Sequence, residues 1–183
     1  LRPTGDRQRE TLFNWLGDRL RGASCLDLFA GSGVLGIEAA SRGAQSVLFV
    51  EKHAQAQAAL DALIDRLLIA NDPAVQSLAR GLSLVKGDAK LQLAALSARS
   101  SQFDLVFIDP PFGEDWRQKI ANALPAILND QALVYYESAT ELDALIPSAA
   151  DDGRSLGEFR RIRHDRAGQV HYHLFSYHFG DAS

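Results

Sequence analysis

The sequence is poor in the residues that mark secreted and membrane proteins. Its 183 residues contain a single cysteine, Cys25, and no methionine. One cysteine excludes an internal disulfide framework and is typical of a reducing compartment, so a cytoplasmic protein is expected. No apolar run approaches the ~20 residues that cross a bilayer, which argues against a membrane partner. Because an initiator methionine is also absent, we expect the native protein to begin upstream of Leu1.

Basic residues are too few to give the chain a net positive charge. The formal net charge is −4, which argues against a general nucleic-acid binder. The arginines are nonetheless concentrated near the two ends of the chain, so a local basic face stays open. The hydrophobic fraction of 46% and the charged fraction of 23% are ordinary for one globular domain. We therefore expect residues 1–183 to form a single domain, and the protein to be a monomer.

Helical and strand patterns alternate along the chain. Helical periodicity predicts helices over residues 6–20, 34–42, 53–69, 88–96 and 115–128. Apolar runs predict strands over residues 24–29, 46–50, 81–86, 103–108 and 132–136. A short helical segment to residue 146, a loop over 148–157 and a hairpin of strands 158–164 and 169–177 follow. The alternation predicts an α/β fold: a doubly wound, Rossmann-like, seven-stranded sheet, mostly parallel, with an antiparallel C-terminal hairpin.

A glycine-rich loop follows the first predicted strand. Residues 26–36 read Leu-Asp-Leu-Phe-Ala-Gly-Ser-Gly-Val-Leu-Gly, with the G-x-G-x-x-G spacing. A backbone without Cβ atoms can approach a ligand closely, as for NAD, FAD or S-adenosylmethionine (SAM), although tight strand-to-helix packing is an alternative. Glu51 lies about 20 residues beyond Gly31, where a ribose-binding acid is expected. Asp88, after the third strand, is placed to accept from an adenine amine or to cap the next helix, or both.

Residues 109–112, Asp-Pro-Pro-Phe, distinguish between these cofactors. The lone pair of an exocyclic amine on a base is delocalised into the ring, and methyl transfer needs it turned toward the electrophile. The Asp109 carboxylate and the Pro110 carbonyl can accept the N–H groups of such an amine and orient it. The fixed φ of Pro110 and Pro111 holds that carbonyl in place, and Phe112 offers a face on which a base can stack. With the glycine loop, this turn indicates a SAM-dependent N-methyltransferase, with Asp109 to Phe112 as catalytic residues.

Acidic residues at three successive strand ends are expected to converge at the carboxyl edge of the sheet, where ligands bind in such folds. These are Glu51, Asp88 and Asp109. The full set of candidate cofactor-binding residues is Asp27, Phe29, Ala30, Gly31, Ser32, Gly33, Glu51, Lys52, Asp88, Ala89 and Asp109.

Candidate RNA contacts come from both ends of the chain. An arginine fork suits phosphate because it binds in a bidentate manner. Strand alternation predicts that Arg161 and Arg163 share one face and Arg160 the other, although a solvated surface explains them equally well. The candidates are Arg2, Thr4, Arg7, Arg9, Arg161 and Arg163.

Histidines are concentrated in the C-terminal hairpin. His171 and His173 share one strand face, and His164 lies near them in the predicted hairpin. No cysteine or acidic partner is evident beside them, and methyl transfer from SAM needs no metal. We therefore expect no metal site.

Several further motifs are spread over nearly the whole length of the chain. Together with the two motifs above, they are Leu1-Arg2-Pro3-Thr4 with Asp6-Arg7, residues 9–15, Leu26-Asp27, residues 29–33, Leu35-Gly36, residues 109–112, Tyr136-Glu137-Ser138 and Gly168-Gln169-Val170. In these motifs the chain closely resembles the RsmD family of bacterial 16S ribosomal RNA guanine-N2 methyltransferases. The opening segment and the Asn14-Trp15 helix are more specific than the glycine loop. Two departures stand out: the basic segment usual before Leu1 is missing, and residues 71–80 look longer than usual.

The resemblance implies SAM as cofactor and a guanine N2 in 16S ribosomal RNA as substrate, in an assembling or assembled 30S subunit. By family pattern, Gly31, Gly33, Glu51, Asp88 and Asp109 face SAM, and residues 109–112 face the guanine. Thr4, Asp6 and Arg7 would close over the site, so residues 1–22 form a helical segment that covers the cofactor and residues 23–183 the catalytic part.

Three other functions remain open at this point. A DNA adenine-N6 or other N-methyltransferase would share the chemistry, but no segment is long enough for a target-recognition domain. An NAD(P)-dependent oxidoreductase would explain the glycine loop and Glu51, yet it leaves residues 109–112 unused. A non-catalytic RNA-binding module could keep the fold, although an intact Asp-Pro-Pro-Phe turn speaks against it.

Overall fold

The computed structural model describes residues 5–146 and 157–180. The chain forms two compact units, Leu1–Ala89 and Lys90–Ser183, which are described one at a time. Among the described helices, none is both long enough and apolar enough to span a membrane.

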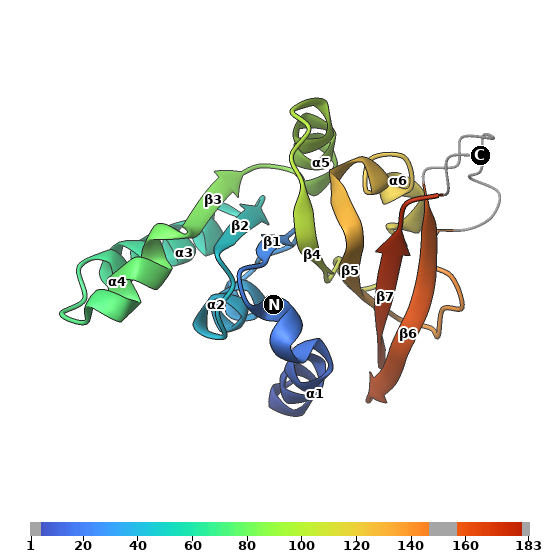
Figure 1. The fold of residues 1–183 in the computed structure, drawn as a ribbon, viewed down its shortest axis with the longest axis horizontal. Coiled ribbons are helices and arrows are strands. Elements are labelled where there is room, and N and C mark those ends of the chain that lie inside the picture. Colours follow the sequence, from blue (N-terminus) through green and yellow to red (C-terminus); the bar gives the residue numbers. More distant parts are fainter. Residues whose placement is uncertain (1–4, 147–156, 181–183) are drawn as a thin grey trace. The chain divides into compact units, whose positions relative to one another are not determined.

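The N-terminal unit is built around three parallel strands in the order β3-β2-β1 (Figure 1). Its elements are α1 (Asp6–Leu16), a 3₁₀ turn (Gly17–Leu20), β1 (Ser24–Asp27), α2 (Val34–Ser41), β2 (Ser46–Glu51), α3 (Ala54–Leu68), α4 (Pro73–Arg80) and β3 (Leu82–Lys86). In register, Asp27 pairs with Phe49, and Glu51 with Lys86. The carboxyl ends of β2 and β3 therefore lie side by side.

Helix α2 packs closely on β2 in the core of this unit. Val47 and Phe49 of β2 are fully buried. A Cβ atom at Gly36 would overlap the ring of Phe49, and one at Gly33 would lie 2.7 Å from Cδ1 of Leu60 on α3. Strand-to-helix packing, the alternative considered for the glycines, thus accounts for Gly36.

The C-terminal unit contains four strands in the order β4-β5-β7-β6 (Figure 1). Its elements are α5 (Ala89–Ala98), which starts at the unit boundary, β4 (Phe103–Ile108), α6 (Arg117–Ile120), a 3₁₀ turn (Pro125–Ile127), β5 (Leu128–Ser138), β6 (Glu158–Ala167) and β7 (Val170–His178). Strands β4 and β5 are parallel, whereas β7 is antiparallel to both of its neighbours. The predicted class is confirmed: a seven-stranded, mostly parallel sheet that ends in an antiparallel hairpin.

Two helix predictions were wrong, and a third helix ends earlier than predicted. The helix over 115–128 is only four residues long, Arg117–Ile120. Turns and a short 3₁₀ segment that begins at Pro125 follow it, and β5 already begins at Leu128. The segment up to residue 146 that was predicted to be helical is a series of bends. The first helix ends at Leu16, where Gly17 takes a positive φ of 49°, and a 3₁₀ turn continues to Leu20.

One helix was missed. Residues 73–80 form α4, which begins with Pro73 after Asp72. The Asp72 carboxylate accepts a hydrogen bond of 2.8 Å from the N–H of Ala74. An Asp cap followed by Pro at the first helical position is a helix-start signal as well as a breaker of the preceding helix. The loop predicted over 148–157 lies outside the described residues, apart from Gly157.

A bulge in β6 corrects the predicted faces of the hairpin arginines. Arg161 pairs with Phe175 and Arg163 with Leu174, so Ile162 is the extra residue. Because partners in a ladder share a face and faces alternate, Arg160 and Arg163 lie on one side and Arg161 on the other. The prediction that Arg161 and Arg163 share a face was therefore wrong.

Candidate functional site

The carboxylate of Glu51 holds the glycine loop in the N-terminal unit. Glu51 ends β2 and is 6% exposed. Its Oε2 accepts a hydrogen bond of 2.7 Å from the N–H of Gly31, and its Oε1 accepts one of 2.7 Å from the N–H of His53. The ends of β1 and β2 are thereby joined through one buried carboxylate.

The backbone of Glu51 also anchors the segment that carries Asp88. The carbonyl of Glu51 accepts hydrogen bonds from the N–H of Gly87 at 2.9 Å and from the side chain of Gln57 at 2.8 Å. Asp88 follows directly and is half-buried. The structure therefore places Glu51 and Asp88 at adjacent strand ends.

Asp27 lies beneath the loop. It is 3% exposed, and its Oδ2 accepts a hydrogen bond of 3.3 Å from the N–H of Gly36. Burial raises the pKa of Asp27 to about 7, and the charge of Glu51 adds a smaller increase. Hydrogen bonds from the backbone of Gly36 and Phe29 lower this pKa and offset part of the effect of burial. This carboxyl group changes its charge near neutral pH while it supports the start of α2.

Backbone hydrogen bonds, within the loop and to β2, also hold the glycine loop. The N–H of Ala30 donates to the carbonyl of Val50 at 3.0 Å, and the N–H of Gly33 donates to Ala30 at 2.7 Å. Gly31 and Gly33 have φ of 54° and 76°, which side-chain-bearing residues rarely adopt. Helix α2 begins directly afterwards, so the positive end of its dipole points into this region.

The remaining cofactor candidates differ in exposure. Ala30 and Ala89 are buried and Phe29 is half-buried, whereas Ser32 and Lys52 are exposed.

The Asp-Pro-Pro-Phe turn starts where β4 ends in the C-terminal unit. Asp109, Pro110 and Pro111 are half-buried, and Phe112 is 74% exposed. The N–H of Glu114 donates to the carbonyl of Pro111 at 3.1 Å, which closes a tight turn. An exposed phenyl ring on a tight turn is free to stack on a planar ligand.

Tyr136 closes the loop that carries this turn. Its hydroxyl accepts a hydrogen bond of 3.1 Å from the N–H of Trp116 and interacts with the Asp115 carboxylate. Burial raises the pKa of Tyr136 to about 12, so the hydroxyl stays protonated. In the sheet, Tyr136 is the partner of Ile108, the residue before Asp109. The loop that leaves β4 after Ile108 is therefore tied, at Trp116, to the residue of β5 that pairs with Ile108.

Further contacts fix the returning part of the loop. Oε2 of Glu114 accepts from the indole N–H of Trp116 and from the Lys119 ammonium, each at 3.0 Å. That ammonium lies 4.4 Å from the centre of the Trp116 ring. Sequence reasoning gave Trp116 and Tyr136 no role at the site. The only signal was the place of Tyr136 in a motif of the family resemblance.

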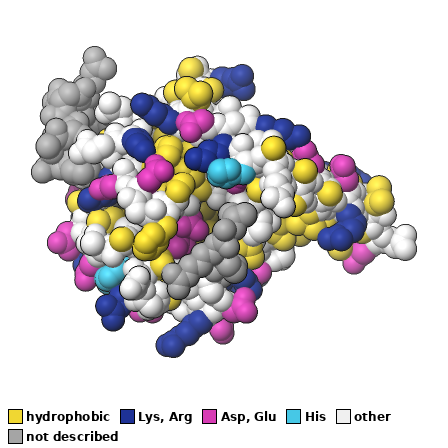
Figure 2. Space-filling view, turned by 180° about the vertical axis from the view of Figure 1, so that it is seen from behind, with side chains coloured by type: hydrophobic (Ala, Val, Ile, Leu, Met, Phe, Trp, Pro, Cys, Tyr) yellow, Lys and Arg dark blue, Asp and Glu magenta, His cyan; other side chains and the backbone are white. Residues whose placement is uncertain are grey.

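The RNA candidates lie in different settings. Arg2 and Thr4 lie outside the described residues. Arg7 is exposed, and Arg9 forms an ion pair of 2.8 Å with Asp6. Arg163 is exposed and bonds the carbonyl of Ile162. On the face shown in Figure 2, basic side chains are interspersed with acidic ones.

Arg161 is engaged within the protein. Its Nη1 donates to Glu141 and to the carbonyl of Leu142, each at 2.8 Å. A guanidinium held this way ties the segment after β5 to β6.

Comparison with known proteins identifies the family. Residues 1–176 match the family model described as "conserved hypothetical protein 95". Ribosomal RNA small subunit methyltransferase D of Escherichia coli is 36% identical over 177 residues, which cover 96% of this chain and 79% of the relative. The chain belongs to the RsmD family.

Solved structures agree with this assignment. A proposed methyltransferase from Escherichia coli superposes with a TM-score of 0.78 at 34% identity, covering 98% of this chain and 89% of that one. A proposed methyltransferase complexed with SAH has a TM-score of 0.69 at 15% identity, covering 93% of this chain and 49% of that one. The second likeness shows the fold alone.

Proposed function

We propose that the protein transfers the methyl group of SAM to the exocyclic N2 amine of a guanine in small-subunit ribosomal RNA. The observation that carries this proposal is the Asp109–Phe112 turn, held on a loop closed at Tyr136, in a member of the RsmD family. The relative from Escherichia coli is a ribosomal RNA small subunit methyltransferase by name, which supports the substrate.

The N-terminal unit offers groups that fit SAM. Each carboxylate oxygen of Glu51 accepts one backbone N–H and has a further lone pair for a ribose hydroxyl. Asp88, beside it, is placed to accept from the adenine amine. When bound, SAM supplies an electrophilic methyl group on a sulfonium. We assign Asp27 a supporting role, because its oxygen accepts from Gly36 below the loop.

The C-terminal unit offers groups that fit the acceptor base. The Asp109 carboxylate and the Pro110 carbonyl accept the two N–H groups of the amine and turn its lone pair toward the methyl group. Phe112, 74% exposed, stacks on the guanine, which must be splayed out of structured RNA. Asp109 need not be a strong base, since the methylated ammonium is acidic enough to lose its proton to water.

Arginines supply the proposed contacts with RNA phosphates. We assign this role to Arg2, Arg7, Arg9 and Arg163, with Thr4 closing over the site, and a lesser one to Arg161, whose guanidinium is already paired with Glu141. We further propose that the 30S subunit is the natural partner, that the protein acts as a monomer, and that residues 1–22 cover the cofactor.

Transfer of radioactive label tests this function. The protein is incubated with methyl-labelled SAM and with 30S subunits or naked 16S RNA from cells that lack the endogenous enzyme. We expect label in RNA with the wild type and very little with Asp109→Ala. Absence of label on both substrates, despite binding of SAM measured by calorimetry, would contradict the proposal.

A further inference from the structure

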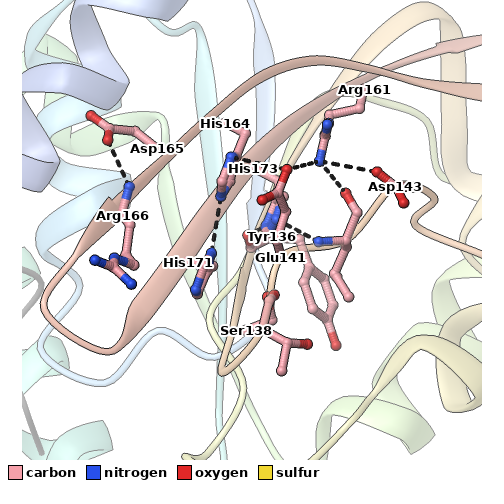
Figure 3. A network of polar contacts seen from close by, with 12 residues as sticks. Tyr136, Ser138, Glu141, Asp143, Arg161, His164, Asp165, Arg166, His171 and His173 are labelled. Carbon is pink, nitrogen blue, oxygen red and sulfur yellow. Dashed lines mark hydrogen bonds and ion pairs between the residues drawn. The ribbon is translucent and has the colours of Figure 1, made fainter.

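Two histidines and a glutamate meet at one end of the C-terminal hairpin (Figure 3). His164 lies on β6 and His171 on β7, and their Nε2 and Nδ1 atoms are 3.0 Å apart. Glu141, in the segment after β5, lies with one carboxylate oxygen 3.5 Å from Nδ1 of His164. One ligand-type atom from each residue lies within 4.8 Å of the other two. The acidic partner that sequence reasoning did not find is thus present, supplied by a segment 23 residues before His164.

The third histidine of the hairpin is committed elsewhere. Nε2 of His173 accepts a hydrogen bond of 3.0 Å from the N–H of Leu142, so the other ring nitrogen, Nδ1, is protonated in the neutral ring and donates to the carbonyl of Tyr136 at 3.3 Å. His173 is fully buried. Its ring stacks on that of His164, with the ring centroids 4.7 Å apart. This contact holds the His164 ring in place, but His173 offers no ligand atom.

We propose that Glu141, His164 and His171 bind a divalent first-row transition-metal ion such as Zn²⁺. Imidazole nitrogens and a carboxylate oxygen are the ligand set that Zn²⁺ takes in proteins when cysteine is absent. Zn–N bonds of about 2.0–2.1 Å place two ligands about 3 Å apart or slightly more. The 3.0 Å between the histidine nitrogens corresponds to that spacing.

Small movements complete the site. The two rings are nearly parallel, 4° apart, and share a hydrogen between their facing nitrogens. A bound ion takes the place of that hydrogen, and each ring turns so that its lone pair points to the ion. The Glu141 side chain is 51% exposed and can rotate toward it. Arg161 donates to the same carboxylate at 2.8 Å and acts as the outer partner that orients a ligand.

The position of the site gives it a structural consequence. His171 pairs in the sheet with Ser138 at the end of β5, two residues beyond Tyr136. The ion would therefore join the segment after β5 to the hairpin, at the carboxyl end of β5, where the Asp109 loop is also anchored. Binding of an ion should make the unit more resistant to heat.

Metal binding itself tests the proposal, independently of methyl transfer. The full chain is dialysed against Zn²⁺, and the bound metal is counted; Co²⁺ in its place reports its ligands by absorption. We expect one ion per chain. His171→Ala and Glu141→Gln should each weaken binding at least about tenfold, the smallest effect usual even for loss of an outer partner. The glutamine keeps an oxygen that can accept from Arg161.

His178→Ala is the matched control, because His178 is an exposed histidine at the far end of the same strand. It should leave binding unchanged, and circular dichroism should show all variants folded. Zn²⁺ should also raise the Tm of the wild type and not that of His171→Ala. Failure of the wild type to bind Zn²⁺, or equal affinity in the wild type and His171→Ala, would overturn the proposal.

Discussion

The N–H of Trp116 donates a hydrogen bond of 3.1 Å to the hydroxyl of Tyr136, which sits beside Ile108 in the sheet. The loop over residues 109–115 is therefore closed at its base by one side chain. This contact explains how a turn with an exposed Phe112 can keep a fixed geometry. The neighbouring Tyr135 has a different role: its side chain lies on the opposite face of β5, and its hydroxyl donates a hydrogen bond of 2.7 Å to Glu137.

Tyr136→Phe should lower kcat more than it changes KM. Loss of the hydroxyl frees the Trp116 N–H and loosens the loop, and a misplaced catalytic group slows the chemical step rather than binding. We expect kcat to fall about tenfold and stability to fall by about 1 kcal/mol. Steady-state kinetics and urea unfolding measure the two effects.

Tyr135→Phe provides the control, because it also removes a buried hydrogen bond from β5. It should reduce stability similarly and leave kcat near that of the wild type. Equal losses of kcat in both variants would mean that Tyr136 acts only through stability.

Asp109→Ala should abolish most of the transfer while leaving SAM binding largely intact. The carboxylate is assigned to the amine of the base, and removal of one group that stabilises a transition state costs about 10²–10³ in kcat. Single-turnover kinetics with saturating RNA and calorimetry with SAM give the two readouts. Normal turnover by this variant would remove Asp109 from the mechanism.

Glu51→Gln should weaken SAM binding. The change replaces one of the two carboxylate oxygens by an NH2 group, which cannot accept the hydrogen bond from Gly31 or from His53, and it removes the charge that favours two ribose hydroxyls. Hydrogen bonds to charged groups contribute about 1.5–3 kcal/mol, so Kd should rise about tenfold or more. Glu38→Gln is the control: Glu38 is a half-buried residue of α2 that pairs with Arg42, and this variant should bind SAM as the wild type does. An unchanged Kd in Glu51→Gln would contradict the ribose assignment.

Asp27 should make stability depend on pH in a defined direction. Burial raises its pKa from 3.8 to about 7, so the folded state holds this proton more tightly than the unfolded state does. The contribution of Asp27 to stability is complete below the pKa that it has in the unfolded state. It is lost as pH rises through the pKa of the folded state, by up to about 1.4 kcal/mol per pH unit.

Comparison with Asp27→Asn isolates this effect. The free energy of unfolding of the wild type, relative to the variant, should decrease between about pH 4 and pH 7 and then level off. Urea unfolding at several pH values measures it. Parallel pH profiles for the two proteins would show that Asp27 does not titrate in this range.

The sequence was sufficient for features that depend on local pattern. β4 was predicted with its observed bounds because Phe103–Ile108 is a short, continuous apolar run. Glu51 and Asp88 were placed at adjacent strand ends because parallel strands end at the same edge. The glycine loop was recognised, but its reading was incomplete: Gly36 is required by the ring of Phe49, a contact between residues 13 apart that spacing does not reveal.

Features that depend on long-range contacts were not predictable. The bulge at Ile162 shifts every later residue of β6 to the face opposite the one that simple alternation predicts. A single extra residue leaves no recognisable pattern in this edge strand, which is rich in charged residues on both faces. Glu141 lies beside His164 in bends that follow β5, where the sequence predicted a helix. Arg161 and His173 hold these bends through hydrogen bonds with Glu141 and Leu142. Tyr136 looked like an ordinary strand residue until its partner Trp116 was placed.

The most direct test of the account is the identity of the methylated nucleoside. RNA from 30S subunits methylated by the wild-type protein is digested to nucleosides, which are separated and identified by mass spectrometry against standards. The account predicts N2-methylguanosine, formed by the wild type and strongly reduced with Asp109→Ala. A methyl group on any other atom or base, or RNA left unmodified on both 30S subunits and naked 16S RNA, would contradict it.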